Sequence, residues 1–291
     1  MYLNSRDAAT AAAAVSLEFA LVTTETPGST TLPASQKHLR TTLKQSRVAA
    51  VERVTRNKRI AERLLQNSST ILTPNFSEVT QEDIQRLFNS YDELYFEDML
   101  KRALGDTPLK FRVSSRMTRA GGKTGSWRKS RNAPIERFEI VISSTLLLQT
   151  FNDDQTDRPI HVTGLECHNR LDALMRVMEH ELIHLSELLG WDSSSCTQDR
   201  FQTFAWQTFG HTDHQHELIT PREHAASQGI GSGTRVRFVS KGRSLEGIVN
   251  RVTRRATVLV PDARGQRFSD GNTYRKYYVP VSILVPIDDV N

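Results

Sequence analysis

Several features common in proteins are scarce or missing from this 291-residue sequence. It has two cysteines, Cys167 and Cys196, which are too few for a disulfide framework, so we expect buried thiols or a metal ligand instead. No run of about 18 apolar residues occurs, which excludes a membrane-spanning helix and a membrane partner. The apolar stretch from Ala11 to Val22 lacks a basic start and is a poor signal peptide. We therefore expect an intracellular, cytoplasmic protein.

Two binding motifs are also absent. The turn-rich stretch Arg119–Gly125 contains Gly-Lys-Thr, but a phosphate-binding loop needs a glycine where Met117 stands, so a nucleotide site is excluded. No Cys-x-x-Cys pair exists, which excludes a zinc ribbon. We interpret the Arg119–Gly125 stretch as a hairpin or as the rim of an active site.

The formal net charge of +5 is unevenly distributed along the chain. Residues 37–63 hold nine Lys/Arg against two Glu, a net of +7, and residues 234–286 hold eleven against three acidic residues, a net of +8. The remainder has a net of −10, from 18 basic and 28 acidic residues. Two basic flanks favour a polyanion, so we expect DNA or RNA to bind through these two segments. An ordinary solvated surface is the alternative, and nothing in the sequence indicates the oligomeric state.

The hydrophobic pattern divides the chain into four parts. Residues 1–36 show no sustained period and are expected to be a disordered lead-in, and residues 37–79 to be a basic helical segment with a linker. Residues 80–227 mix helical and strand patterns and predict an α+β domain, a small sheet flanked by helices. Residues 233–291 alternate with a period of two around glycine turns. They resemble an SH3-like barrel, a separate all-β module.

The central domain gives the clearest element predictions. Thr80 and Asp83 have the spacing of a capping box, and apolar residues recur every three or four positions from Ile84 to Leu100, which predicts an amphipathic helix. Two strands are predicted at 109–114 and 138–143, a long helix from Asn169 to Gly190, and a further helix over 198–209.

The long helix contains His180-Glu181-Leu182-Ile183-His184, an H-E-x-x-H sequence. Four-residue spacing places both imidazoles on one helix face, about 6 Å apart, where both can bind one Zn²⁺ at roughly 2.0–2.1 Å. Glu181 then holds a water molecule and acts as its general base. A chance match is the alternative, but the apolar stripe of this helix turns the histidines away from the core and favours the metal site.

These motifs resemble the SprT-like zinc metallopeptidase domain, the family of the Spartan-type proteases. The resemblance covers Thr80 to His216 and depends on four stretches: Tyr91–Phe96, Arg116–Gly122, Ile140–Leu147 and Met178–His184. It implies a helix-flanked small sheet, zinc held by His180, His184 and a third ligand, and Glu181 as the base. By analogy it implies protein substrates, including proteins bound or crosslinked to DNA.

The third ligand departs from the family pattern, a His-Gly pair before an aromatic residue. If Phe201 is that aromatic residue, Thr197 and Gln198 stand where His-Gly is expected. Cys196 is one residue away and binds zinc strongly as a thiolate, so it is our candidate, with a small buried residue as the alternative. His211 ranks second because it lies about 15 Å further along the next helix.

Two function hypotheses follow. The first is a zinc-dependent endopeptidase that hydrolyses proteins. The alternative is a non-catalytic, zinc-stabilised nucleic-acid-binding protein with a degenerate peptidase site. Glu187 shares the histidine face and is expected to support a ligand, not to bind the metal. In the β-module the arginines Arg235, Arg237, Arg251, Arg254 and Arg255 suit phosphate contact, and the aromatic residues Phe268, Tyr274, Tyr277 and Tyr278 suit base stacking. If these aromatic residues lie in the core instead, a protein-binding module is favoured.

Overall fold

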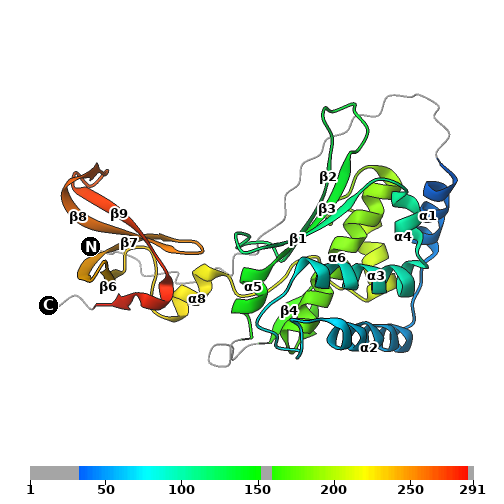
Figure 1. Cartoon of the computed structure of the whole chain (residues 1–291), viewed down its shortest axis with the longest axis horizontal. Helices are drawn as coiled ribbons and strands as arrows, with labels where there is room; N and C mark the ends of the chain where they lie inside the picture. Colours follow the sequence, from blue (N-terminus) through cyan, green and yellow to red (C-terminus); the bar gives the residue numbers. More distant parts are fainter. Residues whose placement is uncertain (1–32, 152–158, 288–291) are drawn as a thin grey trace, which may run out of the picture.

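The computed structural model describes residues 33–151 and 159–287. Residues 1–32 of the expected lead-in lie outside this range, and the first helix begins at Ala34. The described residues form a larger hydrophobic core, between Leu39 and Ile219, and a smaller one between Ala225 and Leu284. Figure 1 shows the two bodies apart, with the short helix α8 (Pro221–Ser227) between them.

The larger unit contains a three-stranded sheet of order β1-β3-β2. Central β3 (Arg137–Ser143) runs parallel to β1 (Leu109–Ser114) and antiparallel to β2 (Gly122–Trp127). The two predicted strands are therefore confirmed. Of the Arg119–Gly125 stretch, expected as a hairpin or rim, residues 119–121 precede the edge strand β2 and residues 122–125 are its first part.

Helices cover this sheet, and the predicted α+β class is confirmed. The central helix α6 packs against β2 and β3, and α3 packs against β1 (Figure 1). None of the described helices is long and apolar enough to cross a membrane. The helices of this unit are α1 (Ala34–Gln45), α2 (Ala50–Asn67), α3 (Gln81–Phe96), α4 (Met99–Leu104), α5 (Ser144–Gln149), α6 (Arg170–Trp191) and α7 (Asp199–Phe204). A π-helix (Ala205–Phe209) and the hairpin β4 (Ile160–Val162) and β5 (Leu165–Cys167) complete it.

The basic N-terminal segment is part of the larger core. Leu39 and Leu43 of α1 and Ile60 and Leu64 of α2 are buried in the same cluster as α6. Arg40 of α1 donates from Nε to the carbonyl oxygen of Gly190, 2.5 Å away. The apolar faces of these helices are therefore packed against the domain, while their basic side chains are exposed or half-buried.

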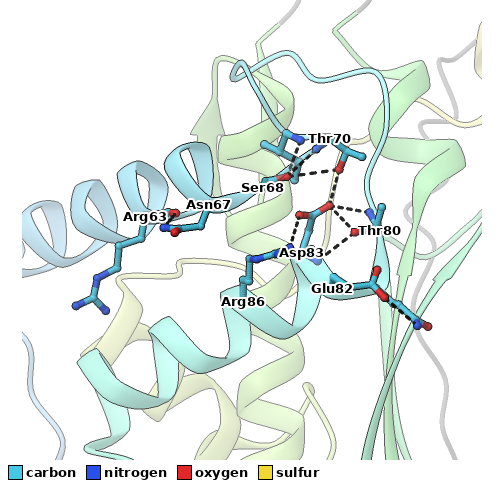
Figure 2. A network of polar contacts seen from close by, with 10 residues as sticks. Arg63, Asn67, Ser68, Thr70, Thr80, Glu82, Asp83 and Arg86 are labelled. Atoms are coloured by element: carbon cyan, nitrogen blue, oxygen red, sulfur yellow. Dashed lines mark hydrogen bonds and ion pairs between the residues drawn. The ribbon is translucent and has the colours of Figure 1, made fainter.

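Helix α3 begins with the predicted capping box. Thr80 Oγ1 accepts from the Asp83 nitrogen at 3.3 Å, and Asp83 Oδ2 accepts from the Thr80 nitrogen at 2.9 Å. The same carboxylate accepts from Thr70 Oγ1 at 2.7 Å and pairs with Arg86 (Figure 2). Ser68 accepts from the Thr70 nitrogen, so the turn after α2 is joined to the start of α3.

Two predicted helix ends differ from the structure. The apolar stripe to Leu100 is divided because Glu97 and Asp98 adopt left-handed backbone angles, with φ of 51° and 59°, and separate α3 from α4. Gly190 lies inside α6, which ends at Trp191, and the C-cap residue Asp192 is left-handed with φ 58°.

The β-module is an open sheet, so the predicted barrel is wrong. Its order is β10-β6-β7-β8-β9, with all neighbours antiparallel, and the two edge strands are not paired with each other within the described residues. Ala225 of α8, Ile230 and the turn at Val281 fill the core, so closure is not needed to bury it. The strands are β6 (Arg235–Ser240), β7 (Arg243–Val252), β8 (Ala256–Arg267), β9 (Thr273–Val279) and β10 (Val285–Pro286).

The Asp83 network gives a stability prediction. Replacing Asp83 with Ala should lower the free energy of unfolding by about 1–3 kcal/mol, because a helix cap is lost and the half-buried donors of Thr70 and Thr80 lose their acceptor. Burial alone would raise the pKa of Asp83, but hydrogen bonds from Ser68, Thr70 and Thr80 outweigh it and hold the pKa below its ordinary 3.8.

The stabilisation should therefore be complete above pH 3.8 and disappear as the pH falls below it. Urea unfolding of both proteins at neutral and acidic pH measures the difference. Glu82→Ala, one residue away on the exposed side, is the control and should change stability much less. Equal stability of the Asp83 variant and the parent at neutral pH would contradict the network.

Candidate metal centre

Helix α6 runs through the centre of the larger unit and contains the residues of the H-E-x-x-H motif. Its N-cap Asn169 accepts from the Asp172 nitrogen at 2.9 Å, as predicted. The helix has 22 residues and is buried over most of its surface, including Glu179, His180, Glu181 and Glu187. Buried polar side chains need hydrogen-bond partners, and these partners build the site.

The two motif histidines face one another. Nε2 of His180 lies 3.1 Å from Nε2 of His184, and the Cys196 sulfur lies with them in a group whose ligand atoms are all within 4.8 Å of one another. Nitrogens on one tetrahedral zinc ion are about 3.3 Å apart, so the pair has the separation that a metal requires. The structure thus brings together the three residues predicted as ligands, and this group could bind a metal ion.

Ser194 links His184 to a carboxylate. The Ser194 hydroxyl donates to Glu187 Oε2 at 2.6 Å and lies 2.7 Å from His184 Nδ1. Because its proton points to the carboxylate, the oxygen must accept from Nδ1–H. The Nε2 lone pair of His184 is then directed at the metal position. Arg200 holds the far side of Glu187, with Nε 2.6 Å from Oε1.

Burial keeps both imidazoles neutral, which a metal ligand requires. It lowers the pKa of His184 to about 4 and that of His180 well below its ordinary value, with neighbouring His184 adding to the effect on His180. Nδ1 of His180 is buried and has no hydrogen-bond partner among the described residues. Phe201 packs on both rings, with centroid distances of 4.9 and 4.7 Å.

Glu181 lies beside this pair, against strand β2. Thr124 donates from Oγ1 to Glu181 Oε2 at 2.7 Å, which orients the carboxyl group. A Cβ atom at Gly122 would come within 2.5 Å of Glu181 Oε1, so only glycine leaves room for it. Burial raises the pKa of Glu181 to about 8, against the opposing effect of the Thr124 hydrogen bond.

His211, the second-ranked ligand, is engaged elsewhere. Its Nε2 lies 2.8 Å from Glu179 Oε2, and Glu179 also accepts from Arg176 at 2.8 Å and from the Tyr91 hydroxyl at 2.9 Å. Arg176 is the main cause that holds the pKa of Glu179 below its ordinary value against burial. His211 therefore stabilises a buried carboxylate.

A groove beside the metal position is open to an extended ligand. A cavity of about 180 Å³ lies between β2 and the connection Ser194–Cys196, and Glu181, His184 and Trp127 line it. Strand β2 is an edge of its sheet. The site is therefore accessible along the strand.

Thr124, Gly122 and Ser194 had not been identified as site residues from the sequence. None lies at helical spacing from the motif, and tertiary folding alone brings them to α6. The only sequence signal was the Arg119–Gly125 stretch, whose glycines indicated an active-site rim.

The ligand assignment can be tested by zinc affinity. Cys196→Ala should weaken zinc binding by more than the roughly 10–100-fold that loss of an outer hydrogen-bond partner costs, and Ser194→Ala should fall within that range. His211→Ala should lose stability and keep its zinc affinity, because its partner is Glu179. Competition with a coloured chelator measures all three. Lost affinity in the His211 variant together with unchanged affinity in the Cys196 variant would reverse the assignment.

Comparison with known proteins gives no relative. No family model matches the chain. No curated protein and no solved structure is significantly similar to it. Function therefore follows from the chemistry of the site.

Proposed function

We propose that the protein is a zinc-dependent endopeptidase that hydrolyses peptide bonds in protein substrates, in the manner of the SprT-like domains that its sequence resembles. One observation carries the proposal. A buried, oriented carboxyl group, Glu181, lies beside a pair of metal-ready imidazoles at the edge of an open groove.

The residues suit zinc and peptide hydrolysis. Two imidazoles and a thiolate are ligands that zinc prefers, and a three-ligand site leaves a fourth position open. When bound, zinc supplies a Lewis acid that polarises a carbonyl group and acidifies water. Glu181 takes the proton of the attacking water and delivers it to the leaving amine, so the new C–O bond forms and the C–N bond breaks without net proton loss. The hydrogen bond from Thr124 holds the carboxyl group in one orientation for both proton transfers.

Substrate binding follows from the position of β2. A polypeptide in extended conformation can lie along this edge strand and pass Glu181 and His184. Trp127 and Leu188 give the groove an apolar part that accepts a side chain. Both cysteines are free thiols, which suits the cytoplasmic location that we propose.

The alternative is a zinc-stabilised nucleic-acid-binding protein without catalysis. It uses the same ligands but gives no role to Glu181. A buried carboxyl group with a raised pKa costs stability, and a structural zinc site is usually closed by four protein ligands. Three ligands and an open groove therefore favour the enzyme.

Glu181→Gln separates these two functions. The variant should keep its fold and stoichiometric zinc but lose proteolysis by at least about 10²-fold, because the general base is gone and the ligands are untouched. Cleavage of an unfolded protein substrate and metal analysis measure this. His184→Ala is the matched control and should lose zinc as well. Full activity of the Glu181 variant, or no proteolysis by the zinc-loaded parent, would favour the alternative.

We propose further that the outer face of the β-module binds the phosphate backbone of DNA or RNA. Arg251, Arg254 and Arg255 are exposed at the end of β7 and in the turn that follows. Tyr278 is 61 % exposed and its strand position is aligned with Thr257, the pairing partner of Arg251. Tyr274 and Tyr277 instead belong to the packed interior, and Phe268 is half-buried against Tyr274. Tyr278 is therefore the most exposed of the four aromatic residues.

Salt dependence tests the nucleic-acid proposal. Replacing the three arginines with alanine in the full chain should reduce the slope of log affinity against log salt by up to about three units, because each phosphate contact releases condensed counterions. Binding to unrelated sequences should weaken by similar factors. Fluorescence anisotropy with labelled DNA and RNA measures both. Unchanged slopes, or no binding by the parent at about 50 mM salt, would leave a protein-binding module.

A further inference from the structure

The two cysteines of the chain have different surroundings. Both are free thiols, and each residue is 3 % exposed, so exposure alone does not separate them. Cys167 ends strand β5 in the larger core, where its sulfur lies 3.6 Å from the Leu165 carbonyl oxygen. Cys196 lies on the connection between α6 and α7 and lines the groove beside the metal position.

The groove gives small molecules a path to Cys196. Its cavity of about 180 Å³ has room for several molecules of the size of water, because one water molecule needs only about 10–15 Å³ of such space. Glu181, His184 and Ser194 line the same space. Hydrogen peroxide is little larger than water and can therefore enter it, whereas Cys167 is not among the residues that line this groove.

A metal ion at the candidate site would change the chemistry of Cys196. Its sulfur and the ligand nitrogens of His180 and His184 lie within 4.8 Å of one another. A cysteine binds zinc as the thiolate, and the thiolate is also the form that attacks peroxides. Zinc has no redox chemistry of its own, so the sulfur is the oxidisable group of this ligand set. The SprT-like pattern has an imidazole in this place.

We propose that Cys196 is an oxidation site, at which a hydroperoxide converts the thiolate to a sulfenic acid and so releases the metal. The inference rests on the zinc binding of the proposed function and does not require peptidase activity. The sulfur attacks one oxygen of hydrogen peroxide, an S–O bond forms, the O–O bond breaks and hydroxide leaves. The sulfur is thereby oxidised and the peroxide reduced.

Oxidation removes one of three metal ligands. A neutral sulfenic acid lacks the charge of the thiolate, and His180 and His184 then remain alone on α6. The oxidised chain should therefore bind zinc as weakly as Cys196→Ala, a loss of more than the roughly 10–100-fold expected for an outer hydrogen-bond partner.

The reaction is reversible by small thiols. Cys167 does not belong to the group around the metal position, so the sulfenic acid has no partner thiol within that group. A small thiol such as glutathione condenses with the sulfenic acid, which releases water and forms a mixed disulfide. A second thiol then restores Cys196 and leaves with the first as a disulfide.

The test follows zinc affinity in the full, zinc-loaded chain before and after treatment with hydrogen peroxide. A coloured chelator measures the affinity once catalase has removed the peroxide. The parent should lose affinity to the level of Cys196→Ala and recover it when glutathione is added. Cys167→Ser is the matched control and should behave as the parent does. Cys196→His keeps three ligands without a thiolate and should not change its affinity.

A second measurement identifies the oxidised atom directly. Dimedone reacts with sulfenic acids, so peptide mass spectrometry after peroxide treatment should find its adduct on Cys196 and not on Cys167. This result does not depend on whether Cys196→His binds zinc. Glu181→Gln, which should bind zinc without proteolysis, should be labelled to the same extent as the parent.

The outcomes distinguish this proposal from the peptidase proposal. Unchanged zinc affinity of the parent after peroxide, an equal loss in a zinc-binding Cys196→His variant, or a dimedone adduct absent from Cys196 would overturn the oxidation site and leave the peptidase standing. A parent that releases zinc as expected but cleaves no protein would overturn the peptidase alone. A parent that binds no zinc would overturn both.

Discussion

The structure depends on burying α6, a helix whose sequence is too polar to be buried without partners. Four ionisable side chains, Glu179, His180, Glu181 and Glu187, are almost fully covered. Each unpaired buried group would cost more than a typical net hydrogen bond contributes, so the surrounding elements must supply donors and acceptors. The partners come from separate parts of the chain: Thr124 from β2, Ser194 and Arg200 from the region after α6, Tyr91 from α3, and His211 from the loop after the π-helix.

The hydrogen bonds that satisfy these buried side chains also position the segments that form the candidate site. The carboxylate of Glu179 holds Tyr91, Arg176 and His211 around one buried charge and so fixes the start of the loop after the π-helix. Opposite it, Glu187 fixes Ser194 two residues before Cys196. The two carboxylates do not face the groove themselves. They determine which neighbouring segments lie close enough to take part in chemistry.

Sequence patterns predicted those features that depend only on residues close together in the chain. The capping box of Thr80 and Asp83, the Asn169 cap and the face shared by His180 and His184 follow from helix geometry, and the structure has them. Thr124 and Ser194 could not be predicted, because a hydroxyl has no characteristic spacing from a helix that it meets through tertiary folding.

The predicted barrel failed for a related reason. The period of two and the glycine turns predicted the strands of the β-module, but closure depends on what covers the edges. Ala225 lies before the predicted module and its side chain belongs to the core of that module, while α8 also contacts α5. A boundary drawn where glycine and serine accumulate misses such a helix, because its own composition resembles that of the preceding domain.

A metal ion at the candidate site would also have a structural effect on the short connection between α6 and α7. His184 is on the helix and Cys196 is on the connection, so an ion bound to both would act as a cross-link that closes a loop of roughly 12 residues. Ordering of this connection and occupancy by the ion are then thermodynamically linked, and each favours the other. One wall of the groove consists of the same connection. An ion bound at this position would therefore hold this wall of the groove in place as well as its own ligands.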